Sequence, residues 1–192
     1  MNLRPYGDRA LLLDCASLDE AQGWYAALAD RAEAVLGART VLLRGEPSAL
    51  RDLVRRTAPA APGQAPEAAV EIAVTYDGPD LEDVARLTGL SATEVVAAHI
   101  GTPWTAAFGG FAPGFSYLVG GDPRLHVPRR ASPRTSVPAG SVGLAGEFSG
   151  VYPRRSPGGW QLIGRTDAPL WDAHRKPPAL LLAGMSVRFV VA

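Results

Sequence analysis

The stretch Gly109-Gly-Phe-Ala-Pro-Gly-Phe-Ser-Tyr117 decides how the second half of this chain is interpreted, and Ser156-Pro-Gly-Gly-Trp-Gln161 has a similar composition. Glycine allows a positive φ and a close approach of the backbone, whereas proline fixes φ and removes a hydrogen-bond donor. Two such runs that also contain Phe, Tyr and Trp predict rigid loops that present an aromatic surface. We therefore expect the functional site in residues 99–166, which hold more than half of the glycines.

The residues around these loops predict a β-barrel preceded by two helices. From residue 102 onward, short apolar runs alternate with Gly and Pro, and the last two runs are 180–182 and 187–191. Many short strands with frequent turns are typical of a compact barrel. Residues 69–76 alternate like a strand, and 80–87 and 92–99 have helical spacing, the second with Ser91 and Glu94 at the spacing of a capping box.

The first part of the chain predicts a separate small α/β domain. A Pro- and Ala-rich linker, 57–68, favours a domain boundary, which we place between a domain of residues 1–66 and a barrel domain of residues 67–192. Strands are expected at 10–14 and 40–43, a further strand at 3–6 or from the second half, and a short helix from Ser48. A longer helix is expected from a cap at Ser17, with Glu20 completing a capping box, to Gly37, on the helical spacing of Leu18, Ala21, Tyr25, Leu28, Ala32 and Val35. The predicted fold class is α+β.

Composition excludes several classes of function. The 19 basic and 19 acidic residues cancel, which argues against a nucleic-acid or anionic-membrane partner. No signal peptide is evident and the longest apolar run, 179–183, is too short to span a membrane, so we expect a cytoplasmic protein. Cys15 is the single cysteine, expected to be a buried inert thiol, and the three histidines lack metal-ligand spacing, so no metal site is predicted.

Polar residues of the second half suggest an anion site. His99, at a predicted helix C-terminus, would be favoured in its protonated form by the helix dipole, as an acid, a base or a charge partner; a structural role is equally open. Arginine forks suit carboxylate or phosphate recognition, although a solvated rim is the alternative. Four arginines lie on one Pro-punctuated loop: Arg124, Arg129, Arg130 and Arg134.

Two further segments match known motifs only in part. The small residues of 137–146 could cradle an anion with backbone amides, but no Walker A lysine follows, and Ser141 is not in a Gly-x-Ser-x-Gly elbow. Residues 87–99 superficially resemble a helix-turn-helix without the basic cluster that DNA binding requires, so a helix pair packed on the barrel is preferred. No autonomous catalytic triad is evident.

Taken in order, these motifs resemble one family, which comprises the B-type subunit of 5-oxoprolinase, the sporulation kinase A inhibitor and the first subunit of allophanate hydrolase. The resemblance spans the whole chain and is strongest over residues 99–166. The motifs that carry it are Gly110-Phe-Ala-Pro-Gly-Phe-Ser-Tyr-Leu118, Asp122-Pro-Arg-Leu125, Val137-Pro-Ala-Gly-Ser-Val-Gly143 and Ser156-Pro-Gly-Gly-Trp-Gln-Leu-Ile-Gly-Arg-Thr166.

The resemblance implies a fold, partners and an activity. The fold would be a small N-terminal α/β domain joined to a cyclophilin-like β-barrel. The partners would be the two other 5-oxoprolinase proteins, a C-type subunit that carries a related barrel and an A-type subunit. With them the chain would cleave 5-oxoproline to glutamate using ATP, and it would be inactive alone. No biotin attachment is evident in this chain.

The resemblance also leaves two alternatives open. One is a regulatory protein that inhibits a sporulation-type histidine kinase. The other is a carboxyltransferase-like subunit of urea or allophanate metabolism.

Residue roles follow from the motifs and the resemblance together. His99 and Arg134 are the catalytic candidates. The substrate- or anion-binding candidates are Arg129, Ser141, Gly143, Gln161 and Arg165. An apolar wall or partner interface, with barrel core as the alternative, is expected from Phe111, Pro113, Gly114, Phe115, Tyr117 and Trp160.

Overall fold

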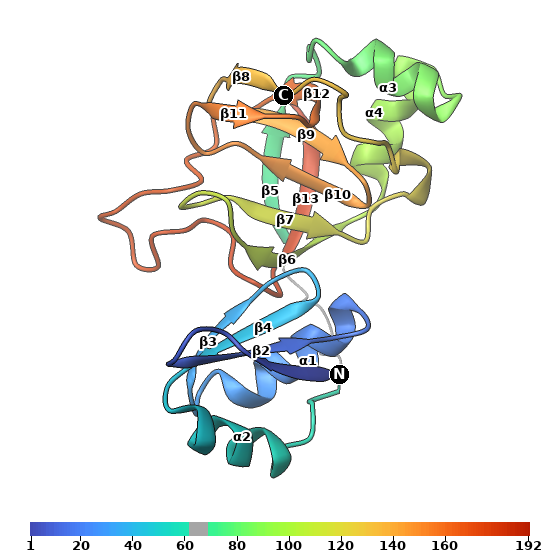
Figure 1. Cartoon of the computed structure of the whole chain (residues 1–192). Coiled ribbons are helices and arrows are strands. Elements are labelled where there is room, and N and C mark those ends of the chain that lie inside the picture. Colours follow the sequence, from blue (N-terminus) through green and yellow to red (C-terminus); the bar gives the residue numbers. More distant parts are fainter. Residues whose placement is uncertain (62–68) are drawn as a thin grey trace. The chain divides into compact units, whose positions relative to one another are not determined.

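The computed structural model describes residues 1–61 and 69–192, and the chain divides into two compact units after residue 64 (Figure 1). The predicted boundary between residues 66 and 67 lies outside the described residues and stays a prediction.

The first unit is a four-stranded antiparallel sheet in the order β1-β2-β4-β3 with two helices packed against it. Leu11 and Leu13 of one central strand and Val41 and Leu43 of the other are fully buried, which is the alternation expected for a sheet with one covered face. Its elements are β1 Asn2–Pro5, β2 Ala10–Asp14, α1 Leu18–Leu28, β3 Glu33–Leu36, β4 Thr40–Arg44 and α2 Pro47–Arg55.

The predicted helix to Gly37 is wrong beyond its first half. Ser17 caps α1 as expected, but α1 ends at Leu28, and Glu33–Leu36 pairs with β4 as the strand β3. Pairing across a hairpin overrides the helical spacing of Ala32 and Val35, because a β-branched side chain such as valine suits a pleated surface. The second helix begins at Pro47 rather than at Ser48, since proline is well suited to a first helical position.

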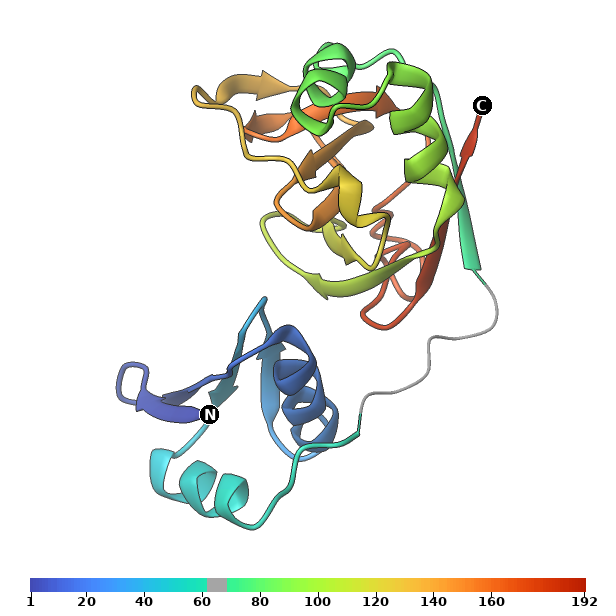
Figure 2. The ribbon, with the colours of Figure 1, turned by 90° about the vertical axis from the view of Figure 1, so that its right-hand side faces the viewer.

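The second unit is a seven-stranded sheet in the order β12-β9-β10-β7-β6-β13-β5. Backbone hydrogen bonds of 2.9 Å in both directions between Thr75 and Arg165 join the two ends of this order, so the sheet is a nearly closed barrel. β13 and β5 are parallel and lie side by side in both views (Figures 1 and 2). The strands are β5 Ala69–Val74, β6 Trp104–Gly109, β7 Ser116–Val119, β9 Ser141–Ala145, β10 Phe148–Val151, β12 Gln161–Arg165 and β13 Ser186–Val191.

Three smaller elements also belong to this unit. A two-stranded ribbon consists of β8 Arg134–Val137 and β11 Ser156–Gly158, and a short 3-10 turn, η1, covers Pro123–Leu125. The strand expected at 180–182 is wrong, because Leu181 is buried in the core without joining a strand ladder. The barrel character of the second unit agrees with the prediction, whereas its cyclophilin-like identity stays a prediction.

Helices α3 Leu81–Thr88 and α4 Ala92–Gly101 lie together beside the barrel (Figure 1). Their buried residues belong to one core with the barrel interior, for example Val84 and Val95 with Phe189. The capping box of Ser91 and Glu94 is formed as predicted. This pair is therefore the packed helix pair that the sequence favoured over a DNA-binding motif.

Candidate functional site

A cluster of aromatic rings forms a second core in the barrel unit. Phe115, Tyr152 and Trp160 are buried in it, with Tyr117 and Phe148 partly buried at its edge. The ring centroids of Phe115 lie 5.5 Å from Trp160 and 5.6 Å from Tyr152 in edge-to-face geometry, which is the favourable arrangement of aromatic pairs. Phe115 and Trp160 thus occupy a core position, the alternative foreseen for the aromatic residues.

Two glycines of the sheet allow these rings to lie directly on the backbone. A Cβ at Gly150 would come within 3.0 Å of Phe115 Cζ and 3.1 Å of Trp160 Cζ3, and one at Gly143 would lie 3.2 Å from Trp160 Cβ. Gly143 and Ser141 are buried in β9, between β10 and β12. The Gly143 backbone therefore takes part in strand pairing and packs against an aromatic ring. The expected open anion-binding loop is not formed at this position.

The loop before Phe115 holds Phe111 in an unusual conformation. Phe111 has a φ of 63°, and the Ala112 amide donates to the Gly110 carbonyl at 2.6 Å, which fits the strained form of the γ-turn. Its side chain is 56% exposed and makes an edge contact with Phe115 at 5.3 Å. Pro113 is also exposed, whereas Gly114 packs against the Trp171 side chain and the Leu170 backbone. Of the expected apolar wall, Phe111 is the aromatic ring that faces solvent.

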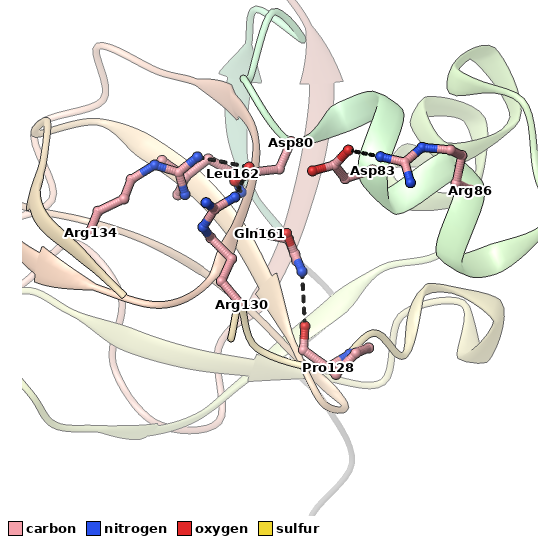
Figure 3. A network of polar contacts seen from close by, with 8 residues as sticks. All are labelled: Asp80, Asp83, Arg86, Pro128, Arg130, Arg134, Gln161 and Leu162. Carbon is pink, nitrogen blue, oxygen red and sulfur yellow. Dashed lines mark hydrogen bonds and ion pairs between the residues drawn. The ribbon is translucent and has the colours of Figure 1, made fainter. Parts of the chain in front are cut away.

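Two arginines converge on one buried carboxylate (Figure 3). Arg130 Nη1 and Arg134 Nη2 donate to the same oxygen, Asp80 Oδ1, at 2.6 and 2.7 Å. The other oxygen, Asp80 Oδ2, accepts from the Leu162 amide at 2.7 Å. Asp80 is 1% exposed, while the Arg130 and Arg134 side chains keep 31% and 23% of their surface exposed. We call Asp80, Arg130 and Arg134 the arginine cluster.

The arginine cluster keeps Asp80 ionised. Burial alone would raise the pKa of the Asp80 carboxyl, but the hydrogen bonds from Arg134 and the Leu162 amide and the nearby Arg130 charge outweigh it and hold that pKa below its usual range. Two guanidinium groups then share one negative charge, so the cluster has one positive charge in excess.

Several polar atoms of the cluster and its neighbour Gln161 lack a partner among the described residues. Arg130 Nε, Arg134 Nη1 and Gln161 Oε1 are buried without a hydrogen bond, while Gln161 Nε2 donates to the Pro128 carbonyl at 3.2 Å. Buried polar groups are usually paired, so unpaired donors beside an excess positive charge indicate a place that suits an anion.

The other predicted anion-binding arginines lie outside this cluster. Arg129 is exposed. Burial raises the pKa of Tyr152, and the positive charges of Arg129 and Arg134 oppose this by lowering it. Arg165 forms an exposed ion pair with Asp77 at 2.9 Å. The structure thus brings Arg134 together with Arg130 and Asp80, and it does not bring Arg165 to them.

His99 lies in the barrel core with neutral partners. Its Nδ1 is 2.7 Å from the Tyr76 hydroxyl, its Nε2 is 3.0 Å from Ser149 Oγ, and its ring stacks on Phe189 at 4.3 Å. Burial lowers the pKa of His99 to about 3. The expectation of a protonated imidazole is wrong, because desolvation outweighs the helix dipole. We call Tyr76, His99 and Ser149 the histidine network.

Asp80 is the functional candidate that sequence reasoning missed. Local pattern assigns it only to the beginning of a helix, whereas its partners Arg130 and Arg134 lie 50 and 54 residues away. The sequence shows an aspartate at the start of a predicted helix and, elsewhere, an arginine-rich loop. Neither feature indicates that Asp80 contacts Arg130 and Arg134.

Three further findings concern Cys15, metal-binding groups and membrane-spanning helices. Cys15 is buried, and that burial raises the pKa of its thiol. Among the described residues, no three His, Cys, Asp or Glu side chains gather where they could hold a metal ion. Within the same part of the chain, no helix has the length and apolar character needed to cross a membrane.

Comparison with known proteins gives a consistent set of relatives. The sequence pattern of the carboxyltransferase domain, subdomains C and D, matches residues 1–181. The B subunits of 5-oxoprolinase from Bacillus subtilis and Escherichia coli O157:H7 are 51% and 52% identical over 124 residues, 63% of this chain and 52% and 57% of theirs. The chain spans only about half the length of these curated relatives. Urea amidolyase of Saccharomyces cerevisiae is 49% identical over 39 residues, 20% of this chain and 2% of that protein.

Solved structures share the fold. The crystal structure of TTHA0988 has a TM-score of 0.81 at 33% identity, covering 96% of this chain and 40% of that one. The conserved uncharacterized protein PH0987 of Pyrococcus horikoshii has a TM-score of 0.63 at 32% identity, covering 100% of this chain and 97% of that one. Urea carboxylase of Kluyveromyces lactis, at 18% identity and a TM-score of 0.68 over 99% of this chain and 21% of that one, shares the fold alone.

Proposed function

The chain belongs to the carboxyltransferase domain family, subdomains C and D, and from this membership we propose that it is one component of an ATP-dependent 5-oxoprolinase that hydrolyses 5-oxoproline to glutamate. The similarity to relatives named as the B subunits of 5-oxoprolinase supports the activity. That those relatives are named as subunits supports a heteromeric complex. The partners in this proposal are an A-type and a C-type subunit of 5-oxoprolinase.

The observation that carries the proposal is the arginine cluster. 5-Oxoproline is a small cyclic amide with one carboxylate. An excess positive charge on Arg130 and Arg134 suits that carboxylate, and the exposed Phe111 ring offers an apolar surface. We assign carboxylate binding to Arg134 and Arg130, with Arg129 and Gln161 as neighbours. Roles for Ser141, Arg165 and His99 have no support from this geometry.

We assign ATP to one of the partner proteins. ATP supplies the driving force for opening a stable lactam, but the described residues offer no phosphate-binding loop. The best candidate for such a loop, the glycine-rich segment 137–146, contains strand β9, and its residues Ser141 and Gly143 are buried. This chain then supplies substrate-binding groups, is inactive alone, and acts in the cytoplasm, where ATP is available.

Two alternatives have an observation in their favour. The likeness to urea amidolyase favours a carboxyltransferase-like role in urea or allophanate metabolism. The exposed Phe111 on a strained turn favours a protein-binding role, such as inhibition of a histidine kinase.

The test is reconstitution with the two partner proteins. We expect ATP-dependent release of glutamate from 5-oxoproline, lost when any one of the three proteins or ATP is omitted. Urea and allophanate serve as competing substrates, and capture of a histidine kinase is measured in parallel. A verified three-protein complex that turns over urea or allophanate but not 5-oxoproline would contradict the proposal.

A further inference from the structure

Asp80 occupies a position where its side chain would ordinarily stabilise a helix. It is the N-cap residue of α3, and aspartate at this position usually accepts a hydrogen bond from an amide of the first turn, worth about 1 kcal/mol. Here the carboxylate makes no such bond. Both of its oxygens accept hydrogen bonds from other parts of the barrel unit. The side chain therefore does not stabilise the start of α3 and instead makes contacts with residues distant in the sequence.

These distant contacts fix the carboxylate and, through it, the arginines. The Asp80 amide donates to the Leu162 carbonyl at 2.9 Å, while the Leu162 amide donates to Asp80 Oδ2 at 2.7 Å. This two-bond link to β12 leaves Oδ1 for Arg130 and Arg134. Because one oxygen holds both guanidinium groups, Asp80 sets their separation and their direction.

The charge balance indicates the class of ligand. Two guanidinium groups and one carboxylate leave one positive charge, which a singly charged carboxylate balances, whereas a phosphate dianion would leave a net negative charge. A second observation points to a ligand: Gln161 is 6% exposed, and its Oε1 has no partner among the described residues. An amide N–H is the kind of donor that this oxygen would accept.

We propose that Asp80 is a positioning residue that holds Arg130 and Arg134 for the carboxylate of a small cyclic amide. The inference rests on the proposed function for the identity of the ligand. Asp80 does not contact the ligand itself; it acts through the two arginines.

The informative variant is Asp80→Asn. Asparagine has a single acceptor oxygen, so it cannot accept from both the guanidinium pair and the Leu162 amide, and one of them faces an NH2 donor instead. Asp80→Glu keeps both acceptors on a longer side chain. Asp83→Asn is the matched control, because Asp83 lies one turn further along α3 in an exposed ion pair with Arg86 (Figure 3).

In the reconstituted complex, we expect Asp80→Asn to raise KM for 5-oxoproline about 10- to 100-fold with kcat little changed, the size typical of a lost orienting partner. Asp80→Glu should give an intermediate KM, and Asp83→Asn the wild-type value. If Asp80 only neutralised charge, Asp80→Asn would leave a more positive cluster and lower KM. If it only stabilised the fold, melting temperature and active fraction would fall at an unchanged KM. Either result overturns the proposal.

A second measurement separates this inference from the proposed function. In ¹⁵N spectra of the arginine side chains of the full chain, we expect the guanidinium groups of Arg130 and Arg134 to show hindered rotation in wild type and Asp83→Asn, and free rotation in Asp80→Asn. Added 5-oxoproline should shift these signals more than inorganic phosphate does. If the wild-type complex lacks 5-oxoprolinase activity, the proposed function fails while these spectra still decide the role of Asp80. The positioning role of Asp80 would be overturned if the guanidinium signals changed neither in Asp80→Asn nor on addition of 5-oxoproline. It would also be overturned if these signals changed with phosphate alone.

Discussion

The histidine network and the arginine cluster both begin on the connection between β5 and α3, at Tyr76 and Asp80, yet they are built differently. Both ring nitrogens of His99 have a hydroxyl partner, and burial keeps the imidazole neutral. The arginine cluster is charged and has one positive charge in excess, and each arginine keeps a buried donor that has no partner among the described residues. A neutral network with both ring nitrogens paired stabilises the core, whereas an unbalanced one is suited to a ligand. The predictions that follow test this distinction.

The largest effect on stability is expected from His99→Ala. The change removes a buried ring and leaves the Tyr76 and Ser149 hydroxyls without their partner, so the free energy of unfolding should fall by about 3–5 kcal/mol. Denaturant unfolding followed by tryptophan fluorescence measures this. His174→Ala, at an exposed histidine, is the control and should change the value by less than about 0.5 kcal/mol. Equal effects of the two variants on the free energy of unfolding would contradict the claim that the histidine network stabilises the core.

Arg134→Ala should act on function rather than on the fold. Asp80 keeps Arg130 and the Leu162 amide as partners, so no buried charge is left alone. We expect glutamate release by the reconstituted complex at low 5-oxoproline concentration to fall about 10- to 100-fold through a higher KM, because a hydrogen bond to a charged group is worth about 1.5–3 kcal/mol. The control is Arg86→Ala, which removes an exposed ion pair worth about 0–1 kcal/mol. Full activity of Arg134→Ala would remove this residue from the site.

The two groups should titrate in different pH windows. The pKa of His99 is about 3 in the folded chain and 6.5 when unperturbed, so the unfolded state binds a proton first as the pH falls. His99 therefore causes the free energy of unfolding to fall by about 1.4 kcal/mol for each unit by which the pH drops between these two values. Asp80, whose pKa is depressed, contributes stability above about pH 4 that is lost only below it.

Unfolding measured between pH 4 and 7 on wild type and His99→Gln separates these contributions. The slope assigned to His99 should disappear in the variant. Asp80→Asn should instead lower the free energy of unfolding by the same amount throughout this range and change the slope of the curve only below it. A slope that persists in His99→Gln would mean that another group causes it.

The smallest effect on stability is expected from Phe111→Gly. Glycine relieves the positive φ but loses the ring contacts with Phe115 and Tyr152, so the free energy of unfolding should change by less than about 1 kcal/mol. Because the ring is exposed, its loss should instead weaken substrate or partner binding, measured as a rise in KM or in the Kd for the C-type partner protein. An unchanged KM and Kd would leave Phe111 without a role in recognition.

The sequence predicted what depends on local pattern and missed what depends on distant contacts. The capping box of Ser91 and Glu94 and the strands around residues 10–14 and 40–44 follow from neighbouring residues, and they are formed. Arg134 and Gln161 could be selected as candidates because they lie in distinctive Gly- and Pro-rich motifs, and their role in a site stays a prediction. The charge state of His99 was wrong because the helix dipole is a local argument, whereas the burial that decides its pKa comes from Phe189 and other distant residues.

Asp80 shows most clearly what local sequence pattern fails to predict. Local pattern gives it the role of a helix cap, yet its side chain serves β12 and two arginines on a distant loop. Nothing within several residues of Asp80 indicates that role, because it arises only when the barrel closes.

A crystal structure of the chain in its complex with 5-oxoproline tests the central claim most directly. We expect the ligand carboxylate within about 2.7–2.9 Å of nitrogens of both Arg130 and Arg134, with Asp80 still bound to the pair. A carboxylate bound elsewhere, with both guanidinium groups contacting Asp80 alone, would contradict it.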